Sequence, residues 1–391
     1  MNNINNKRKD ELMEYHFDTN QLYHDFEHLH DTPEIAFQEH RTSDFIQKEL
    51  KKIGFSVKKI GDTGLLAHME GKKPGAAIAL RADMDALSFY KEDGSVQHFH
   101  ACGHDAHSAM VLAAGRHFAA QTIDEGILYL LFQPGEESML GAKRILAHGL
   151  PRLDGMIGIH LRPKIEMPLG SATPALLHSA SLPITVHFHG KAAHAARPFL
   201  GINAVSSAAM LIHAVDTLTW DTEEDWSAKA TVVDSHQNQH NIIPEFCSVT
   251  LDIRSQNNEL GSSITQKIKT LAKEAADQFG TTLSFEENPG YASNYDPSLV
   301  DICRNAITTV LGKVEPPTHT PGSEDFHAYS MIGGIPTAYI GLGSDLVPGL
   351  HSPDMQFDHS CLPIGTAILI EAVTNCFKQI APHAAAPKNE C

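Results

Sequence analysis

The sequence predicts an α/β domain, built from both ends of the chain, that is interrupted by a smaller α+β domain. Its 391 residues exceed what one hydrophobic core usually organises, so we expect two domains. Continuous apolar runs alternate with helix-like stretches in the first half and near the C-terminus, which is typical of a sheet buried on both faces. The middle of the chain has the order βαββαβ, the ferredoxin-like arrangement. The predicted boundaries are 1–181 and 289–391 for the outer domain and 182–288 for the insertion.

The outer domain is predicted from short apolar runs and from helical stretches of small residues. The predicted buried strands are AAIALRA (76–82), ILYLLFQ (127–133), MIGIH (156–160) and PTAYIGLG (336–343). The predicted helices are AHSAMVLAAGRHFAA (106–120), AKRILAHG (142–149), which ends at a glycine, and LPIGTAILIEAVTNCFKQI (362–380). Helices on the faces of such a sheet give an α/β/α architecture.

The insertion is predicted from a change in periodicity. Its predicted strands are ITVHFHG (184–190), KATVVDS (229–235), CSVTLDIR (247–254) and TLSFEE (282–287). Its predicted helices are INAVSSAAMLIHAVDTL (202–218) and SITQKIKTLAKEAADQF (263–279). Apolar residues alternate in 247–254 and recur at helical spacing in 263–279, so each of these elements buries one face.

Composition excludes several kinds of partner. The formal net charge of -17 argues against nucleic acids and anionic membranes, because they carry the same sign. The N-terminus lacks the apolar core of a signal peptide, and no stretch approaches the roughly 20 apolar residues of a membrane span, so we expect a cytoplasmic protein. The six cysteines are scattered without a CxxC pair, which indicates reduced thiols.

Polar clusters follow the predicted strands at the points where the strands end. These clusters are Asp83 and Asp85, QPGEE (133–137), His160, VQHFHACGHDAH (96–107) and the loop that reaches His351. Ligands bind at this edge of open α/β sheets, so we expect the clusters to form one site.

The side chains of these clusters are typical of a metal site. Zinc-like ions take Cys thiolate, His nitrogen and carboxylate oxygen, and one glycine between Cys102 and His104 lets both turn to the same side. Glu136 and Glu137 leave the chain in different directions, so one can ligate while the other accepts a proton from a metal-bound water. Singly, GEE is more often a solvated turn and Cys102 a small buried hydrophobe. Their convergence favours a metal site.

The order and spacing of five motifs resemble those of the metal-dependent aminoacylase and carboxypeptidase-G superfamily. The motifs are RADMDAL, HACGHDAH, FQPGEE, IGIHLRP and LHSPD, and the resemblance runs from HDTPEIAFQEH (30–40) to the C-terminal helix. The chain is most similar to the amidohydrolase branch, which includes hippurate hydrolase and auxin-conjugate hydrolases. The resemblance implies a zinc-peptidase-like α/β/α catalytic domain with an inserted lid and dimerisation domain.

The resemblance also implies roles for individual residues. One or two divalent ions (Zn, Mn, Co or Ni) would be bound, and Glu136 would be the general base. Asp83 matches an aspartate that orients a ligand histidine, and Asp105 is expected beside the ligands. The implied metal ligands are Cys102, His104, Glu137, His160 and His351.

The insertion contains further residues that match the family. GKAAHAARPFLGINA resembles the lid motif, in which the histidine matching His194 polarises the scissile carbonyl, often from the partner subunit of a dimer. HNIIP (240–244) and LDIR (251–254) match segments whose Asn and Arg contact the substrate carboxylate, so Asn241 and Arg254 are expected to bind substrate. A surface salt bridge is the alternative for Arg254, and an ordinary surface position is the alternative for His194.

These observations predict a metal-dependent amidohydrolase that cleaves the amide bond of N-acyl amino acids. The expected partners are the small-molecule substrate and a second copy of the chain, with no nucleic acid and no membrane. The alternatives are a dipeptidase or carboxypeptidase of the same superfamily, a barrel-type amidohydrolase suggested by His98 and His100, and a non-catalytic metal-binding scaffold. A barrel needs about eight strand-helix repeats, which the insertion argues against. A scaffold has no use for a base such as Glu136.

Overall fold

Residues 15 and 17–382 are described by the computed structural model, and the chain divides into two units. Unit 1 comprises Met1–Leu176, Asn294–His319 and Asp325–Cys391, and unit 2 comprises Leu177–Ser293 and Thr320–Glu324. The predicted insertion, 182–288, lies within the longer segment of unit 2. Residues 1–14, on which the expectation of a cytoplasmic location depends, lie outside the described part of the chain.

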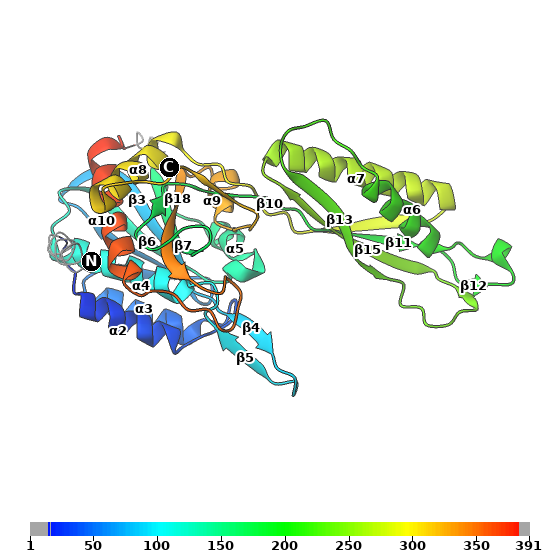
Figure 1. Ribbon diagram of the computed structural model, residues 1–391, viewed down its shortest axis with the longest axis horizontal. Coiled ribbons are helices and arrows are strands. Elements are labelled where there is room, and N and C mark those ends of the chain that lie inside the picture. Colours follow the sequence, from blue (N-terminus) through cyan, green and yellow to red (C-terminus); the bar gives the residue numbers. More distant parts are fainter. Residues whose placement is uncertain (1–14, 16, 383–391) are drawn as a thin grey trace, which may run out of the picture. The chain divides into compact units, whose positions relative to one another are not determined.

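Unit 1 is built on a mixed seven-stranded sheet (Figure 1). In spatial order its strands are β1 (Ser56–Ile60), β2 (Gly64–Glu70), β6 (Glu125–Gln133), β3 (Lys73–Asp83), β7 (Gly155–Pro163), β18 (Thr337–Leu346) and β8 (Ala172–Thr173). The central strands β6, β3, β7 and β18 are parallel, as their continuous apolar sequences predict. Asp83 is in register with Gln133, and His160 with Gly341. The predicted strand at 156–160 continues to Pro163, so His160 lies inside β7 rather than at its end.

Helices cover this sheet and complete the α/β fold predicted from the sequence. They are α2 (Thr19–His30), α3 (His40–Lys52), α4 (His104–Ala120), α5 (Gly141–His148), α8 (Pro297–Leu311), α9 (His327–Met331) and α10 (Cys361–Gln379). α4 and α10 pack together and against β3, while α8 packs against α10 and β18. α10 has the length and composition of a membrane span, contrary to the expectation that no stretch does. Most of α10 is buried in the core of unit 1, and this packing accounts for its apolar sequence.

Shorter elements complete unit 1. The hairpin β4 (Leu87–Tyr90) and β5 (Val96–Phe99) projects from it and joins the end of β3 to the start of α4 (Figure 1). A 3₁₀ helix, η1 (Glu136–Ser138), follows β6. Gly103, with φ of 87°, precedes α4 in the left-handed conformation that glycine adopts without strain. That turn places Cys102 before the helix and His104 at its first residue. The short strands β9 (Leu176–His178) and β17 (Thr318–Thr320), each of which crosses a sequence boundary between the units, pair with each other.

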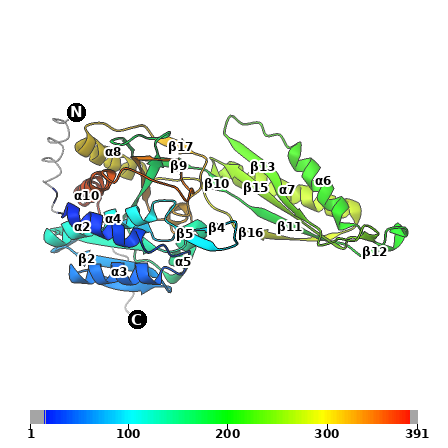
Figure 2. The same cartoon turned by 60° about the horizontal axis from the view of Figure 1, so that its bottom comes forward.

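Unit 2 has the predicted βαββαβ order around its own antiparallel sheet (Figure 2). Its strands are β10 (Ala180–Ser181), β11 (Ile184–His189), β13 (Trp226–Asp234), β15 (Phe246–Ser255) and β16 (Thr282–Glu287). The helices α6 (Ala204–Asp216) and α7 (Asn258–Phe279) pack against it. Side chains of β15 alternate between buried and partly exposed, as its sequence predicts. β12 (Ala193–His194) and β14 (Ile242–Ile243) form a separate pair, and η2 (Pro198–Leu200) lies between β12 and α6.

The described residues therefore form two large open sheets and three short strand pairs rather than the eight strand-helix repeats of a barrel. The barrel-type alternative is wrong.

Candidate active site

The carboxyl edge of the parallel strands brings the predicted ligands of unit 1 together. Four overlapping groups of ligand atoms have all their members within 4.8 Å of one another. The groups are Cys102–His104–His160, Asp83–His104–His107, Cys102–Glu137–His351 and His104–Glu136–Glu137. They contain all five predicted ligands and the predicted base, and they add Asp83 and His107, to which the sequence assigned no ligand role. Three of the five ligands lie within or after strands that are distant in the sequence, so the sheet creates this cluster.

Two buried atoms of the cluster have no hydrogen-bond partner among the described residues: His104 Nε2 and Glu137 Oε1. An unpartnered buried polar group costs about 1–3 kcal/mol, so a native protein rarely leaves one without a function. His104 Nε2 lies 3.8 Å from Glu136 Oε2 and 4.0 Å from Glu137 Oε1. Cys102 Sγ lies 3.5 Å from His160 Nε2, and His351 Nε2 lies 3.5 Å from Glu137 Oε2. Sulfur, imidazole nitrogen and carboxylate oxygen are the donor set of a zinc-like divalent ion, so these residues fit one.

The ionisation of the cluster is consistent with a cation site. Burial raises the pKa of Glu137 to about 7, and burial together with the Glu137 carboxylate raises the pKa of the Cys102 thiol well above its usual range. Burial opposes the charged form of His104, but Asp83 and Cys102 outweigh it and raise the pKa of His104. Burial lowers the pKa of His160 and of His351, which keeps both imidazoles neutral and able to ligate. Acidic groups that retain protons in one buried place are those that a divalent cation would deprotonate.

Asp85 orients three residues of the cluster at once. Its backbone carbonyl accepts a hydrogen bond from His104 Nδ1 (2.9 Å), so Nε2 of that ring is the nitrogen left for a ligand. Its carboxylate accepts from the backbone N–H of Glu136 at Oδ1 and of Glu137 at Oδ2, both at 3.0 Å. The sequence marked Asp85 only as a carboxylate after a strand. No local signal shows that it reaches a loop 51 positions away.

A buried ion network lies behind the predicted base. The Arg81 guanidinium pairs with Asp83 (2.6 Å) and Asp325 (3.0 Å), and all three side chains are buried. Gln133 Nε2 donates to both Asp325 oxygens, at 2.8 and 3.0 Å. The Asp325 backbone N–H donates to Glu136 Oε1 (3.4 Å). Charge pairing thus fixes the residue that contacts the Glu136 carboxylate.

Asp83 hydrogen-bonds His107, which is not a predicted ligand, and its Oδ2 lies 3.8 Å from Nε2 of the predicted ligand His104. Its Oδ1 accepts from His107 Nδ1 (2.8 Å), whereas the Nδ1 of His104 is held by Asp85. His107 Nε2 in turn accepts from the Leu161 N–H (3.0 Å), so both ring nitrogens of His107 are engaged. His107 therefore ties β3, α4 and β7 together beside the ligand cluster.

The remaining polar residues of the 96–107 stretch lie outside the ligand groups. Asp105 accepts from His30 Nδ1 (2.7 Å) and from the Ala106 N–H (2.8 Å), so it joins α2 to the start of α4. His98 bonds Ser88 across the hairpin (3.1 Å). His100 is buried, but it belongs to no ligand group among the described residues. The interpretation of His98 and His100 as metal ligands, which the barrel alternative required, has no support in this geometry.

The substrate-contacting residues predicted from the insertion lie at two ends of unit 2. His194, on β12, is exposed, and its Nδ1 accepts from the Ala196 N–H (3.0 Å). Asn241 lies beside it, because the Ala195 N–H donates to the Asn241 carbonyl (2.9 Å). Arg254 is in register with Ser181 of β10, and β10 and β12 lie at opposite ends of unit 2 in both views (Figures 1 and 2). Unit 2 therefore holds His194 and Asn241 together but not Arg254 with Asn241.

Arg254 is also engaged with neighbouring side chains. Its Nε donates to the Asp252 carboxylate (3.0 Å) and its Nη1 to Ser323 Oγ (3.0 Å). The salt bridge named as the alternative for Arg254 is therefore present, and it leaves Nη2 for any further contact.

The chain matches the model of one protein family and resembles several known proteins. The model of peptidase family M20/M25/M40 matches residues 79–375, which include all the ligand groups. The N-acetyl-L-cysteine deacetylase of Bacillus subtilis (strain 168) is 29% identical over 358 residues, covering 88% of this chain and 85% of the relative. The hippurate hydrolase of Campylobacter jejuni subsp. jejuni is 26% identical over 356 residues, covering 85% of this chain and 91% of the relative.

Solved structures share the fold. A protein from methicillin-resistant Staphylococcus aureus superposes with a TM-score of 0.82 at 24% identity, covering 92% of this chain and 96% of that one. A Bacillus subtilis peptidase of the M20 family that binds two metal ions superposes with a TM-score of 0.76 at 23% identity, covering 92% and 99%. At these identities the likeness establishes the architecture alone.

Proposed function

Because the chain belongs to peptidase family M20/M25/M40, we propose that this hydrolase is a metal-dependent amidohydrolase that cleaves the amide bond of N-acyl amino acids. One observation carries the proposal. Buried His104 Nε2 has no hydrogen-bond partner among the described residues and lies 3.8 Å from Glu136 Oε2 and 4.0 Å from Glu137 Oε1. The Asp85 carboxylate accepts from the backbone N–H groups of both glutamates. That arrangement provides a ligand carboxylate and a second carboxylate beside it, which amide hydrolysis at a metal centre requires.

The ligands assigned to the ion are Cys102, His104, Glu137, His160 and His351. When bound, the divalent ion would supply Lewis acidity, polarising the substrate carbonyl and lowering the pKa of water towards about 7. The Glu136 carboxylate receives the proton of the attacking water at Oε2 and returns it to the leaving nitrogen. The Asp325 N–H at Oε1 keeps that carboxylate directed at the cluster.

His194 supplies the donor to the developing oxyanion in this proposal. Because its Nδ1 accepts a hydrogen bond from Ala196, the neutral ring carries its proton on Nε2, which is the form that donates to a substrate oxygen. A small substrate cannot contact both ends of unit 2. We therefore assign His194 and Asn241 to the site of a second copy of the chain, and the residual donor of Arg254 to the carboxylate of the substrate.

The substrate class rests on the named activities of the relatives. The deacetylase and the hippurate hydrolase both act on N-acyl amino acids by name, and a third relative, an IAA-amino acid hydrolase of Arabidopsis thaliana, is 26% identical over 370 residues. Identities below 30% do not transfer the particular acyl group or amino acid, so the proposal stops at the class.

The test combines metal analysis with hydrolysis of a broad panel of N-acyl amino acids and dipeptides, in the presence of zinc, manganese, cobalt or nickel. We expect turnover of at least one N-acyl amino acid, which a chelator abolishes and added metal restores. Turnover of dipeptides alone would indicate a peptidase of the same family. A metal-loaded protein that is inactive on the whole panel would support the scaffold alternative.

A further inference from the structure

Glu39 is a buried carboxylate that contacts the loop of the proposed base from outside the ligand cluster. Its Oε1 accepts from the Gly135 N–H (2.9 Å) and from the Phe37 N–H (2.8 Å), and its Oε2 accepts from Thr63 Oγ1 (2.7 Å). The residue is fully buried. Gly135 immediately precedes Glu136, so this contact fixes the backbone directly before the proposed base and its neighbouring ligand.

Glu39 makes no ion pair with any residue that the structure describes, although such pairs are common elsewhere in the molecule. Burying a carboxylate among neutral donors costs free energy, because its hydration is lost without a compensating charge. A glutamate at this position is therefore not explained by its contribution to stability. It is explained by geometry, since one side chain supplies acceptors for three donors that belong to three separate segments.

Phe37 and Gly135 show how tightly the two segments fit. A Cβ atom at Gly135 would collide with the Phe37 ring, so the ring lies directly against the loop. Phe37 has φ of 65°, a conformation that costs a non-glycine residue free energy and persists only where contacts enforce it. Its N–H bond to Glu39 is one such contact. The Arg144 guanidinium stacked 3.6 Å from the ring centroid is another.

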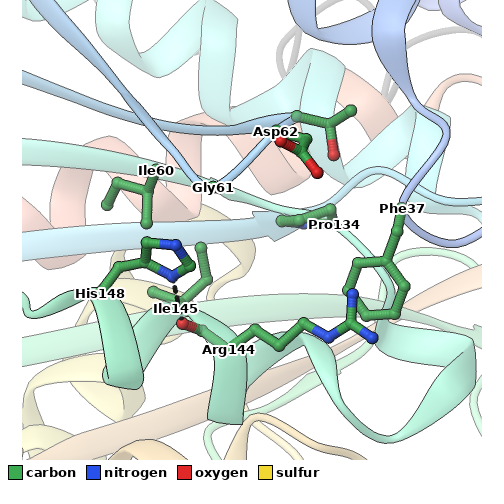
Figure 3. A pocket seen from close by; sticks show the side chains of 9 residues that line it. Phe37, Ile60, Gly61, Asp62, Pro134, Arg144, Ile145 and His148 are labelled. Carbon is green, nitrogen blue, oxygen red and sulfur yellow. Dashed lines mark hydrogen bonds between the residues drawn. The ribbon is translucent and has the colours of Figure 1, made fainter.

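Only a few contacts hold Phe37 in this conformation, because a cavity lies beside it. A cavity of about 130 Å³ lies behind the loop and is lined by Phe37, Pro134 and Arg144 (Figure 3). The side chains of Phe37 and Arg144 lie together at one end of this cavity, away from His148 at the other (Figure 3). Apart from the Phe37 ring against Gly135, the cavity leaves this side of the loop without close packing.

We propose that Glu39 is a positioning residue that holds Gly135, and through it Glu136 and Glu137, in the geometry that hydrolysis needs. The role rests on the function proposed above for Glu136. Glu39 acts as a hydrogen-bond acceptor and not as a charge, because all three of its partners are neutral donors. A glutamine can satisfy the same partners, with its oxygen accepting from the two N–H groups and its amide donating to the Thr63 hydroxyl.

The test compares Glu39→Ala, Glu39→Gln and Glu39→Asp. We expect E39A to lower kcat about 100-fold, the cost of a misplacement of about 1 Å, while KM and bound metal stay within about twofold. We expect E39Q to retain kcat within about threefold. E39D keeps the charge but withdraws the acceptors, so it is expected to resemble E39A. If E39A does not fold, E39D shows whether Glu39 acts as a hydrogen-bond acceptor or as a charge.

Glu34→Ala is the matched control. Glu34 lies in the same segment, but its carboxylate accepts from the Thr42 N–H (2.9 Å) and hydroxyl (3.0 Å) at the start of α3 rather than from the base loop. E34A is expected to lower thermal stability and leave kcat within about threefold. The proposal is overturned if E39D and E39Q lose kcat equally, if a folded E39A or E39D keeps wild-type kcat, or if E34A loses as much kcat as E39A.

Hydrogen exchange separates this proposal from the function on which it rests. In E39A and E39D, but not in E39Q or E34A, the amides of residues 135–138 are expected to exchange at least tenfold faster, since the Gly135 N–H loses its acceptor. If these amides exchange faster in E39A and E39D but the wild type hydrolyses nothing, the positioning role of Glu39 stands and the proposed function is rejected. Unchanged exchange in E39A and E39D would contradict the positioning role of Glu39, whatever their activity.

Discussion

Cys102 distinguishes this cluster from an ordinary group of buried histidines and carboxylates. Its sulfur lies 3.5 Å from His160 Nε2 and in ligand groups with both His104 and Glu137. Burial raises the pKa of this thiol, so without a cation it stays protonated. Its importance therefore depends on metal binding, and a substitution should reveal that directly.

Cys102→Ser is expected to weaken metal binding by more than the roughly 10–100-fold that loss of a supporting contact costs, because it removes a ligand. Metal competition with a chromophoric chelator would measure the affinity. Cys247→Ala is the control, since Cys247 is equally buried but lies in the core of unit 2. Equal metal affinity in C102S and wild type would remove Cys102 from the ligand set.

Metal uptake is expected to release protons and to weaken as the pH falls. The pKa of Glu137 is raised to about 7 in the absence of metal, so below that pH the ion has to displace its proton, whereas above it the carboxylate is already ionised. His104, whose pKa is also raised, adds a proton in the same direction. Calorimetric titration in two buffers of different ionisation enthalpy measures the number released. Equal affinity at pH 6 and pH 8 would contradict the assignment of Glu137.

Among the elements, the QPGEE loop (133–137) is the one on which the site depends. Asp85 accepts from two of its N–H groups, Glu39 from a third, and Gln133 at its start is fixed by Asp325. Three segments of the chain therefore determine where the two glutamates stand. The Phe37 ring lies against Gly135, and buried hydrogen bonds fix the backbone N–H groups of the loop.

Glu39→Gln is expected to stabilise the protein at neutral and alkaline pH. Burial raises the pKa of Glu39 above its ordinary 4.5, so the folded state binds its proton more tightly than the unfolded state. The wild type therefore gains stability as the pH falls from the raised value towards 4.5, and the advantage of E39Q disappears over that interval. Thermal unfolding of both proteins from pH 8 to pH 4.5 measures it. A less stable E39Q at pH 8 would indicate that the charge itself is stabilising.

Local patterns predicted the central elements of each unit but few of their mutual contacts, and they did not predict α2, α3, β1, β2 or α8. The central strands and the βαββαβ order follow from periodicities within single segments, and both are confirmed. The β4–β5 hairpin was missed because its polar sequence alternates weakly. The contact between Glu39 and Gly135 joins positions 96 apart, and no periodicity encodes such a contact. The motifs predicted which residues form the site, whereas the contacts between their atoms depend on the register of the sheet.

At the scale of the whole molecule, the residues assigned to the proposed reaction are divided between the two units. The ligand groups and Glu136 belong to unit 1, whereas His194 and Asn241 belong to unit 2. In the proposed function, His194 of one copy acts in the site of a second copy, because His194 and Arg254 lie at opposite ends of unit 2.

Mixing two inactive variants tests that requirement. His194→Ala keeps Glu136, and Glu136→Gln keeps His194, so a mixed dimer contains one complete site if His194 acts on the partner. Equal mixing after reversible dissociation is expected to restore about one quarter of wild-type activity, because half of the dimers are mixed and each has one of two sites complete. His213→Ala, an exposed histidine of α6, is the control and should retain full activity. No recovery on mixing would place His194 in the site of its own chain.

The central claim is that Glu136 moves the proton while Glu137 and its neighbours hold the metal. The most direct measurement is kcat of Glu136→Gln on an N-acyl amino acid that the wild type hydrolyses, with bound metal quantified in the same sample. The account predicts wild-type metal content and a kcat lowered by about 100-fold to 10,000-fold, the contribution typical of a general base. A metal-loaded E136Q that keeps wild-type turnover would contradict it.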